Sequence, residues 1–297
     1  MSGIQATHKL NYSRLPYDNE GYVIHMLTSS ERTFLTNAYI IETKNGLVLV
    51  DTMMINSDAA QLCQHVNNLG KPLLAVIITH GHPDHYNGTH LVISGLGHIP
   101  IISTKGVKDC IQNTADGKEV KWRPYFGDEW PEHKLLPNQL VKDDEVLNLD
   151  GLDYHFKDLG AAESSSDLYF TLGQQRSAVF LGDVVFNTVH GFLNDGNTRL
   201  WLQVLEQLSV AIGDVKSLFT GHGNPGNTAQ LINAQIGYIE YYRAALASVK
   251  QGPQMLSPEQ RKQFYKKVID QYPDYQLAAF IKGGIDAVTQ ELNKEGN

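Results

Sequence analysis

Two periodicities of apolar and polar positions follow one another along this chain, and together they predict both strands and helices. Short apolar runs rich in Val, Ile and Leu, bounded by turn residues, indicate strands. These runs occupy residues 22–27, 36–42, 47–50, 73–78, 99–103, 146–149, 152–159, 168–172, 178–181 and 217–220. Longer segments with an apolar stripe at helical spacing indicate helices, and they occupy residues 57–69, 104–114, 198–212, 228–249, 257–270 and 275–293.

The order of these elements predicts an α+β fold. Strands, a helix, a strand and a helix are followed by a second set of strands and helices, so the chain reads as two similar halves. Two such halves favour a four-layer αββα sandwich of two mixed β-sheets flanked by helices. The expected organisation is an N-terminal irregular arm at residues 1–20, a main domain at residues 21–250, and C-terminal helices at residues 251–297 packed on that same domain.

Local signals refine this outline. Asn45-Gly46, between two strands, predicts a hairpin with a type I′ turn, because both residues accept a positive φ. The helix at residues 57–69 is expected to begin with Ser57 or Asp58 as its cap and to stop at Gly70. Residues 198–212 are expected to place Leu200, Val204, Leu205 and Leu208 on one face.

Residues 115–145 break the periodicity. Trp122, Tyr125, Phe126 and Trp130 lie there among charges and prolines. This density of aromatic residues indicates an ordered loop. The loop either forms a lid over a site or is pinned to the surface by its own aromatic side chains.

Composition narrows the class of protein. The hydrophobic content of 42% and charged content of 19% are typical of a globular protein. The net charge of -8 argues against a nucleic acid or an anionic membrane surface as a partner. No apolar run approaches the ~20 residues of a membrane-spanning helix, and the polar start of the chain lacks the pattern of a signal peptide. A cytoplasmic location is the default, and a periplasmic or secreted one applies if a signal peptide has been removed. The two cysteines, Cys63 and Cys110, indicate no disulfide framework.

The stretch Thr79-His80-Gly81-His82-Pro83-Asp84-His85 carries the densest chemistry in the chain. It directly follows the apolar strand predicted at residues 73–78, so its side chains stand on a rigid base. Imidazole nitrogens and carboxylate oxygens are ligands that zinc prefers. The stretch therefore predicts a metal site, and the alternative is a solvated His-rich turn.

Two further strands end in a residue that could bind a metal. Asp183 follows Gly182 at the end of the strand at 178–181, and His222 lies between Gly221 and Gly223 after the strand at 217–220. Glycine lets the backbone turn sharply at such positions. Taken singly, Asp183 could be a turn residue and His222 a loop histidine. Together with the cluster at 80–85, they favour one site at the ends of several strands.

These motifs resemble the metallo-β-lactamase superfamily over roughly residues 20–250. The resemblance rests on His80-x-His82-x-Asp84-His85, then Gly182-Asp183, then Thr220-Gly221-His222-Gly223, in that order. Asp51, in Val50-Asp51-Thr52, matches the family's buried aspartate that braces the metal loop. The resemblance implies the αββα sandwich with a metal pair at the edge between its sheets.

The resemblance also implies a ligand set. His80 and His82 would bind the first metal, Asp84, His85 and His222 the second, and Asp183 would bridge the two. The family's usual third histidine for the first metal is missing from residues 158–168. Glu163 is the best replacement, because a carboxylate can bind zinc there. The alternatives are Ser164, or a Glu163 that points to solvent while the first metal keeps fewer protein ligands.

The implied cofactors are two divalent metal ions. Zinc is expected, and manganese or iron are alternatives because a more oxygen-rich site favours harder ions. A metal pair lowers the pKa of bound water and so activates hydroxide at neutral pH. Asp84 is expected to be catalytic, since it could orient that hydroxide and shuttle its proton.

The expected function is therefore hydrolysis of a carbonyl-type substrate, namely a lactone, thioester, ester or β-lactam, with sulfate and phosphate esters left open. One alternative is a mononuclear iron dioxygenase that acts on a persulfide. The other is a binding protein that keeps the metal without turnover. The expected partner is a small molecule, with no nucleic acid and no membrane.

Residues beside the ligands could contact the substrate. His190 could bind an oxyanion or be an ordinary loop residue. Tyr86 and Asn224 adjoin predicted ligands, and Trp122 could belong to an apolar wall. The C-terminal helices are expected to pack either against the sandwich or against a second subunit, so a homodimer is one of the alternatives.

Overall fold

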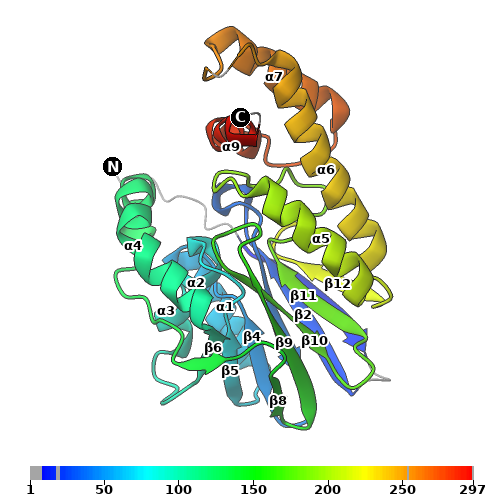
Figure 1. The fold of residues 1–297 in the computed structure, drawn as a ribbon. Coiled ribbons are helices and arrows are strands. Elements are labelled where there is room, and N and C mark those ends of the chain that lie inside the picture. Colours follow the sequence, from blue (N-terminus) through cyan, green and yellow to red (C-terminus); the bar gives the residue numbers. More distant parts are fainter. Residues whose placement is uncertain (1–8, 18–20, 253, 296–297) are drawn as a thin grey trace. The chain divides into compact units, whose positions relative to one another are not determined.

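The computed structural model describes residues 9–17, 21–252 and 254–295. Its described strands form a seven-stranded sheet of order β1-β2-β3-β4-β5-β6-β7 and a five-stranded sheet of order β12-β11-β10-β9-β8 (Figure 1). Among the described residues, no helix combines the length and the apolar character needed to cross a membrane.

The first sheet changes from antiparallel to parallel pairing at β4. Antiparallel pairing joins β1 to β2, β2 to β3 and β3 to β4, and parallel pairing joins β4 to β5, β5 to β6 and β6 to β7. The strands span β1 Asn11–Tyr17, β2 Tyr22–Thr28, β3 Asn37–Glu42, β4 Leu47–Val50, β5 Leu73–Ile77, β6 Ile101–Thr104 and β7 Gln139–Val141. Because β4 and β5 run parallel, their carboxyl ends lie at the same edge, where Asp51 and the His-rich loop begin.

The second sheet also mixes both kinds of pairing. Its strands are β8 Val146–Leu149, β9 Leu152–Gly160, β10 Asp167–Leu172, β11 Ala178–Gly182 and β12 Ser217–Thr220. β8 and β9 pair antiparallel, whereas β11 and β12 pair parallel. Parallel pairing puts the ends of β11 and β12 at one edge, so Asp183 and His222 emerge there together.

The helices cluster in two groups. Before β7 come α1 Asn56–Asn68, α2 Pro83–Tyr86, α3 Thr89–Ile93 and α4 Lys105–Phe126, with short 3-10 turns η2 Glu31–Thr33 and, after α4, η3 Gly127–Glu129. After β11 come α5 Thr198–Ile212, α6 Thr228–Val249, α7 Pro258–Gln271, α8 Ala279–Gly283 and α9 Ile285–Glu295. Helix α1 contacts α3, and the long helix α6 contacts α5, α7 and α9.

The chain divides into two compact units. The first comprises Met1–Asp158 and Leu172–Gln174, and the second comprises Leu159–Thr171 and Gln175–Asn297. The C-terminal helices belong to the second unit, in which they contact α6. The domain boundaries expected at residues 20 and 250 stay predictions.

Several predicted elements differ in the structure. The expected N-terminal irregular arm includes strand β1, which pairs with β2 from Asn11 to Tyr17; residues 1–8 and 18–20 lie outside the described part. The C-terminal helix expected at residues 275–293 is interrupted, since α8 ends at Gly283 and α9 starts at Ile285. On α5 the buried side is formed by Trp201, Leu205, Leu208 and Ile212, whereas Leu200 is 48% exposed.

The predicted loop at residues 115–145 is helical in its first part, because α4 continues to Phe126. Its buried residues are only Val107, Cys110, Ile111 and Phe126, so its middle carries no apolar stripe that a periodicity could reveal. The C-terminal end of α4 is instead held by tertiary packing. Phe126 and Trp130 form a buried cluster with Met54 and Ile55, and Phe34 and Trp122 pack against that cluster.

The turn between β3 and β4 is a hairpin turn, but not of type I′. Neither Asn45 nor Gly46 has a positive φ. Instead, Asp150 accepts hydrogen bonds from Asn45 N (2.7 Å), Asn45 Nδ2 (2.9 Å) and the Thr43 hydroxyl (2.7 Å). A Cβ on Gly46 would lie 2.4 Å from Leu74 Cδ1, so close packing, rather than left-handed backbone, favours glycine there.

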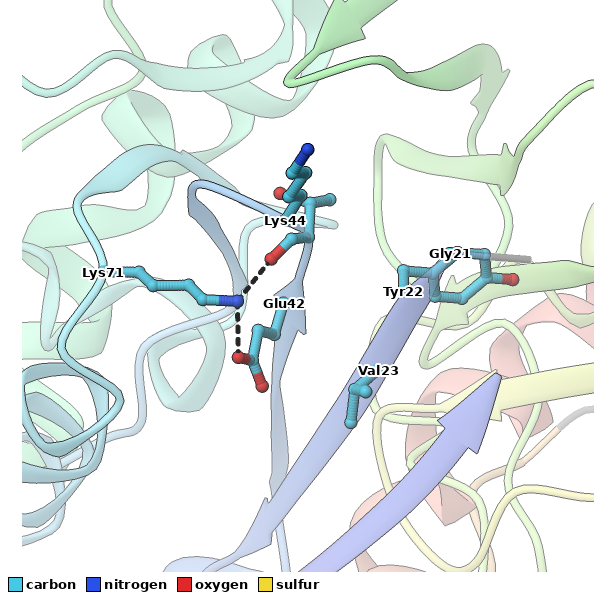
Figure 2. A pocket seen from close by; sticks show the side chains of 7 residues that line it. Gly21, Tyr22, Val23, Glu42, Lys44 and Lys71 are labelled. Carbon is cyan, nitrogen blue, oxygen red and sulfur yellow. Dashed lines mark hydrogen bonds and ion pairs between the residues drawn. The ribbon is translucent and has the colours of Figure 1, made fainter. Parts of the chain in front are cut away.

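A pocket of about 250 Å³ lies beside the turn of this hairpin (Figure 2). Lys71 Nζ bonds both the Glu42 carboxylate (2.7 Å) and the Thr43 carbonyl oxygen (2.6 Å) there. Glu42 also bonds His25 Nε2 at 2.8 Å. Because Glu42 and Lys71 are paired with each other in this pocket, they hold β2, β3 and the start of β5 together.

The cap of α1 is also supplied from a distance. The residue before the helix is Ile55, which has no side-chain cap, so neither Ser57 nor Asp58 caps it as predicted. The Ser57 amide instead donates to Glu129 Oε2 at 2.9 Å. Asp58 accepts a hydrogen bond from the Thr33 hydroxyl at 2.8 Å and holds the η2 turn. A carboxylate from another segment thus satisfies one amide of the first turn that has no partner within the helix.

Candidate metal centre

The first unit supplies four buried candidate ligands from one loop. The backbone leaves β5 at Ile77, passes His80, and begins the short helix α2 with His82 as its N-terminal cap residue. His80, His82, Asp84 and His85 are between 0% and 6% exposed. The His80 ring centroid lies 4.9 Å from that of His82 and 4.2 Å from that of His85. The predicted cluster is therefore a compact, buried group, and the alternative of a solvated turn is excluded.

Asp51 and Thr79 fix the orientation of two imidazoles. Asp51 accepts hydrogen bonds from Thr79 N (3.0 Å) and from the Thr79 hydroxyl (2.9 Å), and it lies 2.7 Å from His85 Nδ1. Both carboxylate oxygens already accept from Thr79, so His85 Nδ1 is the donor in its contact with Oδ2, and its Nε2 has the lone pair. Asp51 therefore braces the loop as predicted, by binding both its start and its end.

The same reasoning applies to His80. Its Nδ1 lies 3.0 Å from the Thr79 hydroxyl oxygen. The single proton of that hydroxyl is donated to Asp51, so the oxygen can only accept from His80. His80 Nδ1 is thus protonated and Nε2 carries the lone pair. Imidazoles that donate one nitrogen to the protein and offer the other are the usual form of a metal ligand.

Electrostatics at Asp51 reflect its depth in the fold. Burial raises the pKa of this carboxyl above its ordinary value, and the contacts with His85 and Thr79 act in the opposite direction. Asp51 is also one of the few non-glycine residues with a left-handed backbone, at φ 60°. Such a conformation costs on the order of 1 kcal/mol, and the three contacts of its carboxylate offset it.

Asp84 has a partner that the sequence pattern did not single out. The Thr36 hydroxyl donates to Asp84 Oδ2 at 2.8 Å, and the Thr36 amide in turn donates to the Ser29 hydroxyl at 2.9 Å. Thr36 lies just before β3, far from the His-rich loop in sequence. No local motif marks it, because its role depends on β3 and β5 belonging to the same sheet.

The second unit supplies Glu163 from a tightly bonded loop between β9 and β10. Asp167 Oδ2 accepts from the amides on both sides of Glu163, at 3.2 Å from Ala162 N and 2.9 Å from Ser164 N. The Ser164 hydroxyl donates to Ser166 O at 2.9 Å. Glu163 is 1% exposed, so it does not point to solvent. The hydroxyl of Ser164, the alternative ligand, is hydrogen-bonded within the loop.

Asp183 and His222 emerge side by side from the parallel strands β11 and β12. Asp183 Oδ2 lies 3.0 Å from His222 Nε2, and both residues are at most 2% exposed. Gly223 has φ +86°, and a Cβ there would lie 2.0 Å from Asn187 O. Only glycine therefore allows the close approach of these two loops. The Phe186 ring stacks on the His222 imidazole at a centroid distance of 5.3 Å.

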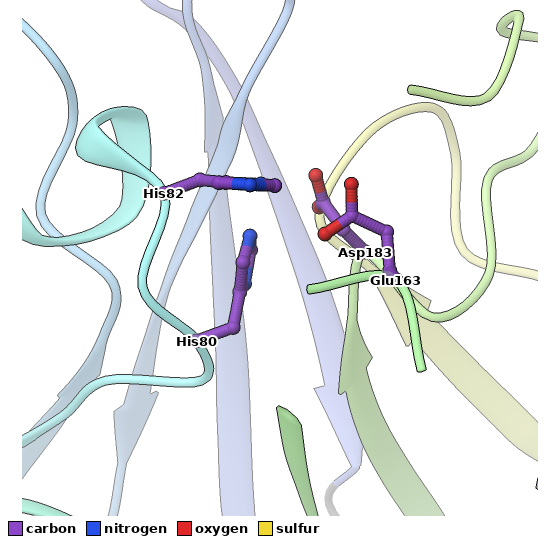
Figure 3. A group of neighbouring side chains, drawn as sticks. All are labelled: His80, His82, Glu163 and Asp183. Carbon is purple, nitrogen blue, oxygen red and sulfur yellow. The ribbon is translucent and has the colours of Figure 1, made fainter. Parts of the chain in front are cut away.

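Figure 3 shows from which elements four of these side chains come. His80 and His82 extend from the loop that follows β5 in the first unit. Glu163 and Asp183 extend from loops of the second unit, with their carboxylates toward each other. Each unit thus presents a buried group of imidazole or carboxylate donors of the kind that binds divalent metals.

The motif order and these donor groups agree with a match to a known family. The family model described as the metallo-β-lactamase superfamily matches residues 32–222, well over half of the chain. The chain belongs to the metallo-β-lactamase superfamily. The match begins at residue 32, shortly before Thr36, and ends at His222.

Solved metallo-β-lactamases share the fold. An enzyme from Pontibacter korlensis is 18% identical, with a TM-score of 0.63, and the similarity covers 78% of this chain and 99% of that one. The mono-zinc form of FIM-1 from Pseudomonas aeruginosa is 16% identical, with a TM-score of 0.58 and coverage of 78% and 95%. These similarities confirm the predicted α+β class, with two mixed β-sheets flanked by helices.

The curated relatives match this chain over only part of their own length. The uncharacterized protein YobT of Bacillus subtilis is 25% identical over 125 residues, which are 42% of this chain and 53% of that protein. The alkyl/aryl-sulfatase BDS1 of Saccharomyces cerevisiae is 21% identical over 233 residues, which are 66% of this chain and 36% of that protein. The matched regions thus span about a third to a half of the curated relatives' own lengths.

The four predicted substrate contacts differ in their surroundings. Tyr86 is 1% exposed, and burial raises the pKa of its phenol well above the ordinary value. Trp122 is half-buried on α4, with its ring 5.4 Å from Phe34. Asn224 is exposed, and its carbonyl oxygen accepts from Asn187 Nδ2 at 2.7 Å. Their contacts with a substrate stay predictions.

His190 lies fully buried among tyrosines of the second unit. Its Nδ1 is 3.1 Å from the Tyr238 hydroxyl, and its ring centroid is 5.6 Å from that of Tyr275. Burial lowers the pKa of this imidazole to about 4, so it is neutral at neutral pH. The proposed oxyanion contact would therefore be a hydrogen bond from a neutral ring rather than an ion pair.

Proposed function

We propose that this chain is a metal-dependent hydrolase. The proposal is carried by the tautomers that Asp51 and Thr79 impose on His85 and His80, because both imidazoles then offer Nε2 as a ligand. Buried imidazoles held in this way have no role in packing that an apolar residue would not fill better.

The ligand assignment follows the family pattern and the chemistry of the donors. His80, His82 and Glu163 would bind the first metal, and Asp84, His85 and His222 the second, with Asp183 between them. Three features support Glu163 in place of the usual histidine, namely its burial, the amides beside it that Asp167 fixes, and the occupied Ser164 hydroxyl. Zinc suits the mixed set of imidazoles and carboxylates, with manganese or iron as alternatives.

The metals would supply Lewis acidity, since they lower the pKa of water and polarise the electrophile. The protein's own contribution is positioning. Asp84, held by the Thr36 hydroxyl, would orient the attacking water and accept its proton. Asp51 keeps His85 in place while charge develops. Because all the ligands are at most 6% exposed, the site strengthens electrostatic interactions with a developing oxyanion.

The substrate class proposed first is a carbonyl compound, namely a lactone, thioester, ester or β-lactam. A sulfate ester is the second candidate, because one curated relative is an alkyl/aryl-sulfatase. A carbonyl substrate and a sulfate ester would need the same polarised electrophile and positioned water. They differ in the shape of the transition state, so measured rates must decide between them.

The deciding experiment combines metal analysis with a substrate panel. The purified protein is loaded separately with Zn²⁺, Mn²⁺ and Fe²⁺, and hydrolysis is measured on one lactone, thioester, ester, β-lactam and alkyl sulfate. We expect turnover of at least one of these, with two metals per chain. Asp84→Asn should lower kcat by roughly 10²- to 10⁴-fold. Thr228→Ser, a change in the first turn of α6, is the matched control.

Two results would overturn the proposal. One iron per chain together with oxygen uptake on a persulfide would identify a dioxygenase. Full metal occupancy without turnover of the panel, and with Asp84→Asn equal to the wild type in every assay, would identify a binding protein that keeps its metal.

A further inference from the structure

We propose that Phe192 and Phe280 form an apolar subsite beside the metal centre, and that it receives the alkyl or aryl part of the substrate. The inference rests on the proposed function, because it assigns the substrate class of that same site. It concerns residues of the second unit alone.

Two phenylalanine rings contact the candidate ligand His222, and a third contacts one of these two rings. The Phe186 ring is nearly parallel to the imidazole, with an interplanar angle of 10°. The Phe280 ring meets the imidazole edge-on, at a centroid distance of 6.2 Å and an angle of 85°. Phe192 in turn lies 5.2 Å from Phe280, at 70°. The aromatic surface is therefore continuous from the metal ligand outward.

The exposure of these rings separates two roles. Phe186 is 4% exposed and supports the imidazole from within the unit. Phe192 and Phe280 are only half-buried, although both are large apolar side chains beside a polar site. Half-buried aromatic surface next to a few polar groups is the usual lining of a small-molecule site. A bound alkyl chain or aromatic ring would remove this remaining surface from water.

The backbone holds this surface in place. Gln276 N donates to Thr188 O at 3.0 Å, and His190 N donates to Gln276 O at 3.0 Å, so the C-terminal segment is attached to the loop after Asp183. The Tyr242 hydroxyl donates to Ile281 O at 2.7 Å. A Cβ on Gly284 would lie 2.7 Å from Leu193 Cβ. A wall fixed at these points is preorganised, so a ligand does not have to order it.

The position of Phe280 in the chain favours a role in specificity. It lies on α8, beyond the residues 32–222 that match the family model, whereas the metal ligands lie within them. The shared part of the chain would thus provide the reaction, and the C-terminal segment would select the substrate. The chemical class that fits is an ester whose acid or leaving group carries an alkyl chain or an aromatic ring.

The aromatic residues in the last turns of α4 and just after it form the rival apolar wall. Phe126 and Trp130 form a buried cluster with Met54 and Ile55, and Trp122 packs against it. The apolar area of Phe126 and Trp130 is therefore used within the first unit, whereas Trp122 is half-buried and Tyr125 is 66% exposed. Phe280 is the better candidate for contact with a ligand because its ring meets the candidate metal ligand His222 itself, and Phe192 extends that surface.

The test uses binding, without turnover. Calorimetry measures the affinity of the zinc-loaded protein for n-alkyl carboxylates from acetate to octanoate. We expect the Kd to fall about two- to fourfold with each added CH₂, with a negative heat-capacity change. Phe280→Ala and Phe192→Ala should flatten this dependence while leaving the Kd of acetate unchanged. Phe280→Leu should retain most of the dependence.

Controls separate the subsite from a structural role. Val210→Ala removes apolar surface from a side chain of the same unit that is 90% exposed, and it should change nothing. Metal content is measured for every variant. If Phe280→Ala lowers zinc content and acetate affinity together, with the chain-length dependence intact, Phe280 only supports His222 and the inference is wrong. A dependence lost in Trp122→Ala instead would place the apolar wall on α4 and would also overturn it.

Failure of the subsite proposal can be distinguished from failure of the hydrolase proposal. Hydrolysis of short and long substrates at equal kcat/KM, with no chain-length dependence of binding, would refute the subsite and leave the hydrolase. A chain-length dependence that vanishes in Phe280→Ala supports the subsite, even where the panel is not turned over and the hydrolase proposal fails.

Discussion

Asp51 shows how much of this site depends on one carboxylate. It follows β4 with a left-handed backbone at φ 60°, and it binds residues at both ends of the metal loop. The Thr79 hydroxyl passes the effect on to His80 Nδ1, 3.0 Å away. A chain of hydrogen bonds that starts at one buried acceptor thus sets the tautomers of two histidines.

Asp51→Asn should therefore weaken metal binding without unfolding the loop. Asparagine tolerates the left-handed backbone, but its NH₂ would face the protons of Thr79 and His85 where Oδ2 now accepts both. We expect a 10- to 100-fold loss of metal affinity, measured by competition with a chromogenic chelator. Thr79→Ser keeps the hydroxyl and serves as the control. An unchanged affinity in Asp51→Asn would refute the role of Asp51 in setting the tautomers.

Glu163 is the second residue whose replacement is informative. We expect Glu163→Ala to lower the metal content from two ions per chain toward one, because the first metal would lose a ligand. Glu163→His should restore occupancy and shift the preference from manganese toward zinc. Elemental analysis after dialysis measures both. Ser164→Ala, beside it in the same loop, should keep both ions, and equal losses in Glu163→Ala and Ser164→Ala would show that only the loop was disturbed.

At the scale of elements, carboxylates that are distant in sequence stabilise turns for which the neighbouring residues supply no side-chain cap. Glu129 binds the first turn of α1, and Asp150 binds the turn between β3 and β4. The hairpin was expected from Asn45-Gly46 alone, yet its geometry follows from Asp150 and from the closeness of Leu74 to Gly46. Such contacts join segments that are distant in sequence, so no window of residues contains them.

The Asp150 contact predicts a dependence of stability on pH. Hydrogen bonds from Asn45 and Thr43 lower the pKa of this carboxyl from 3.8 to about 2. A depressed pKa stabilises the folded state fully above about 3.8, and this contribution disappears as the pH falls toward 2. We expect Asp150→Ala to lower the urea midpoint at pH 7 and to approach the wild type at pH 2.5.

Asp144→Ala provides the comparison for that measurement, because Asp144 is an exposed carboxylate of the same unit with an ion pair to Lys157. A difference between Asp150→Ala and the wild type that stays constant from pH 7 to pH 2.5 would contradict the assignment.

At the scale of the whole molecule, metal binding should be coupled to stability. Seven imidazole and carboxylate groups are costly to bury, and a bound divalent cation would lower that cost. A ligand at a thousandfold excess over its Kd stabilises the folded state by about 4 kcal/mol. We expect removal of metal by a chelator to lower the Tm by several degrees, and addition of Zn²⁺ to restore it.

Differential scanning calorimetry with matched chelator and buffer controls checks this expectation. Phe186→Leu, beside His222, should lower the Tm with and without metal alike, since it changes packing rather than a donor. A Tm that is the same with chelator and with Zn²⁺ would argue against a metal held by these groups.

The sequence offered a compact set of candidate metal ligands, because metal ligands have few chemical types and short, regular spacings. His80, His82, Asp84 and His85 lie within six residues after an apolar strand, and Asp183 and His222 lie at strand ends beside glycine. The α+β class followed from the order of strands and helices. Helix α4 was underestimated, since its polar middle has no stripe and its end is held by Trp130 and Met54.

The amino-acid sequence by itself thus predicted the candidate ligand types, the strand ends that carry them and the lack of a histidine in residues 158–168. Tertiary structure alone decided which atoms they present. The His80 and His85 tautomers depend on Asp51, Asp84 is oriented by Thr36, and Glu163 is fixed by Asp167. It also placed Phe280 against His222, 58 residues away in the chain. The physical reason is that hydrogen bonds and ring contacts depend on distance in space, whereas a sequence pattern records only distance along the chain.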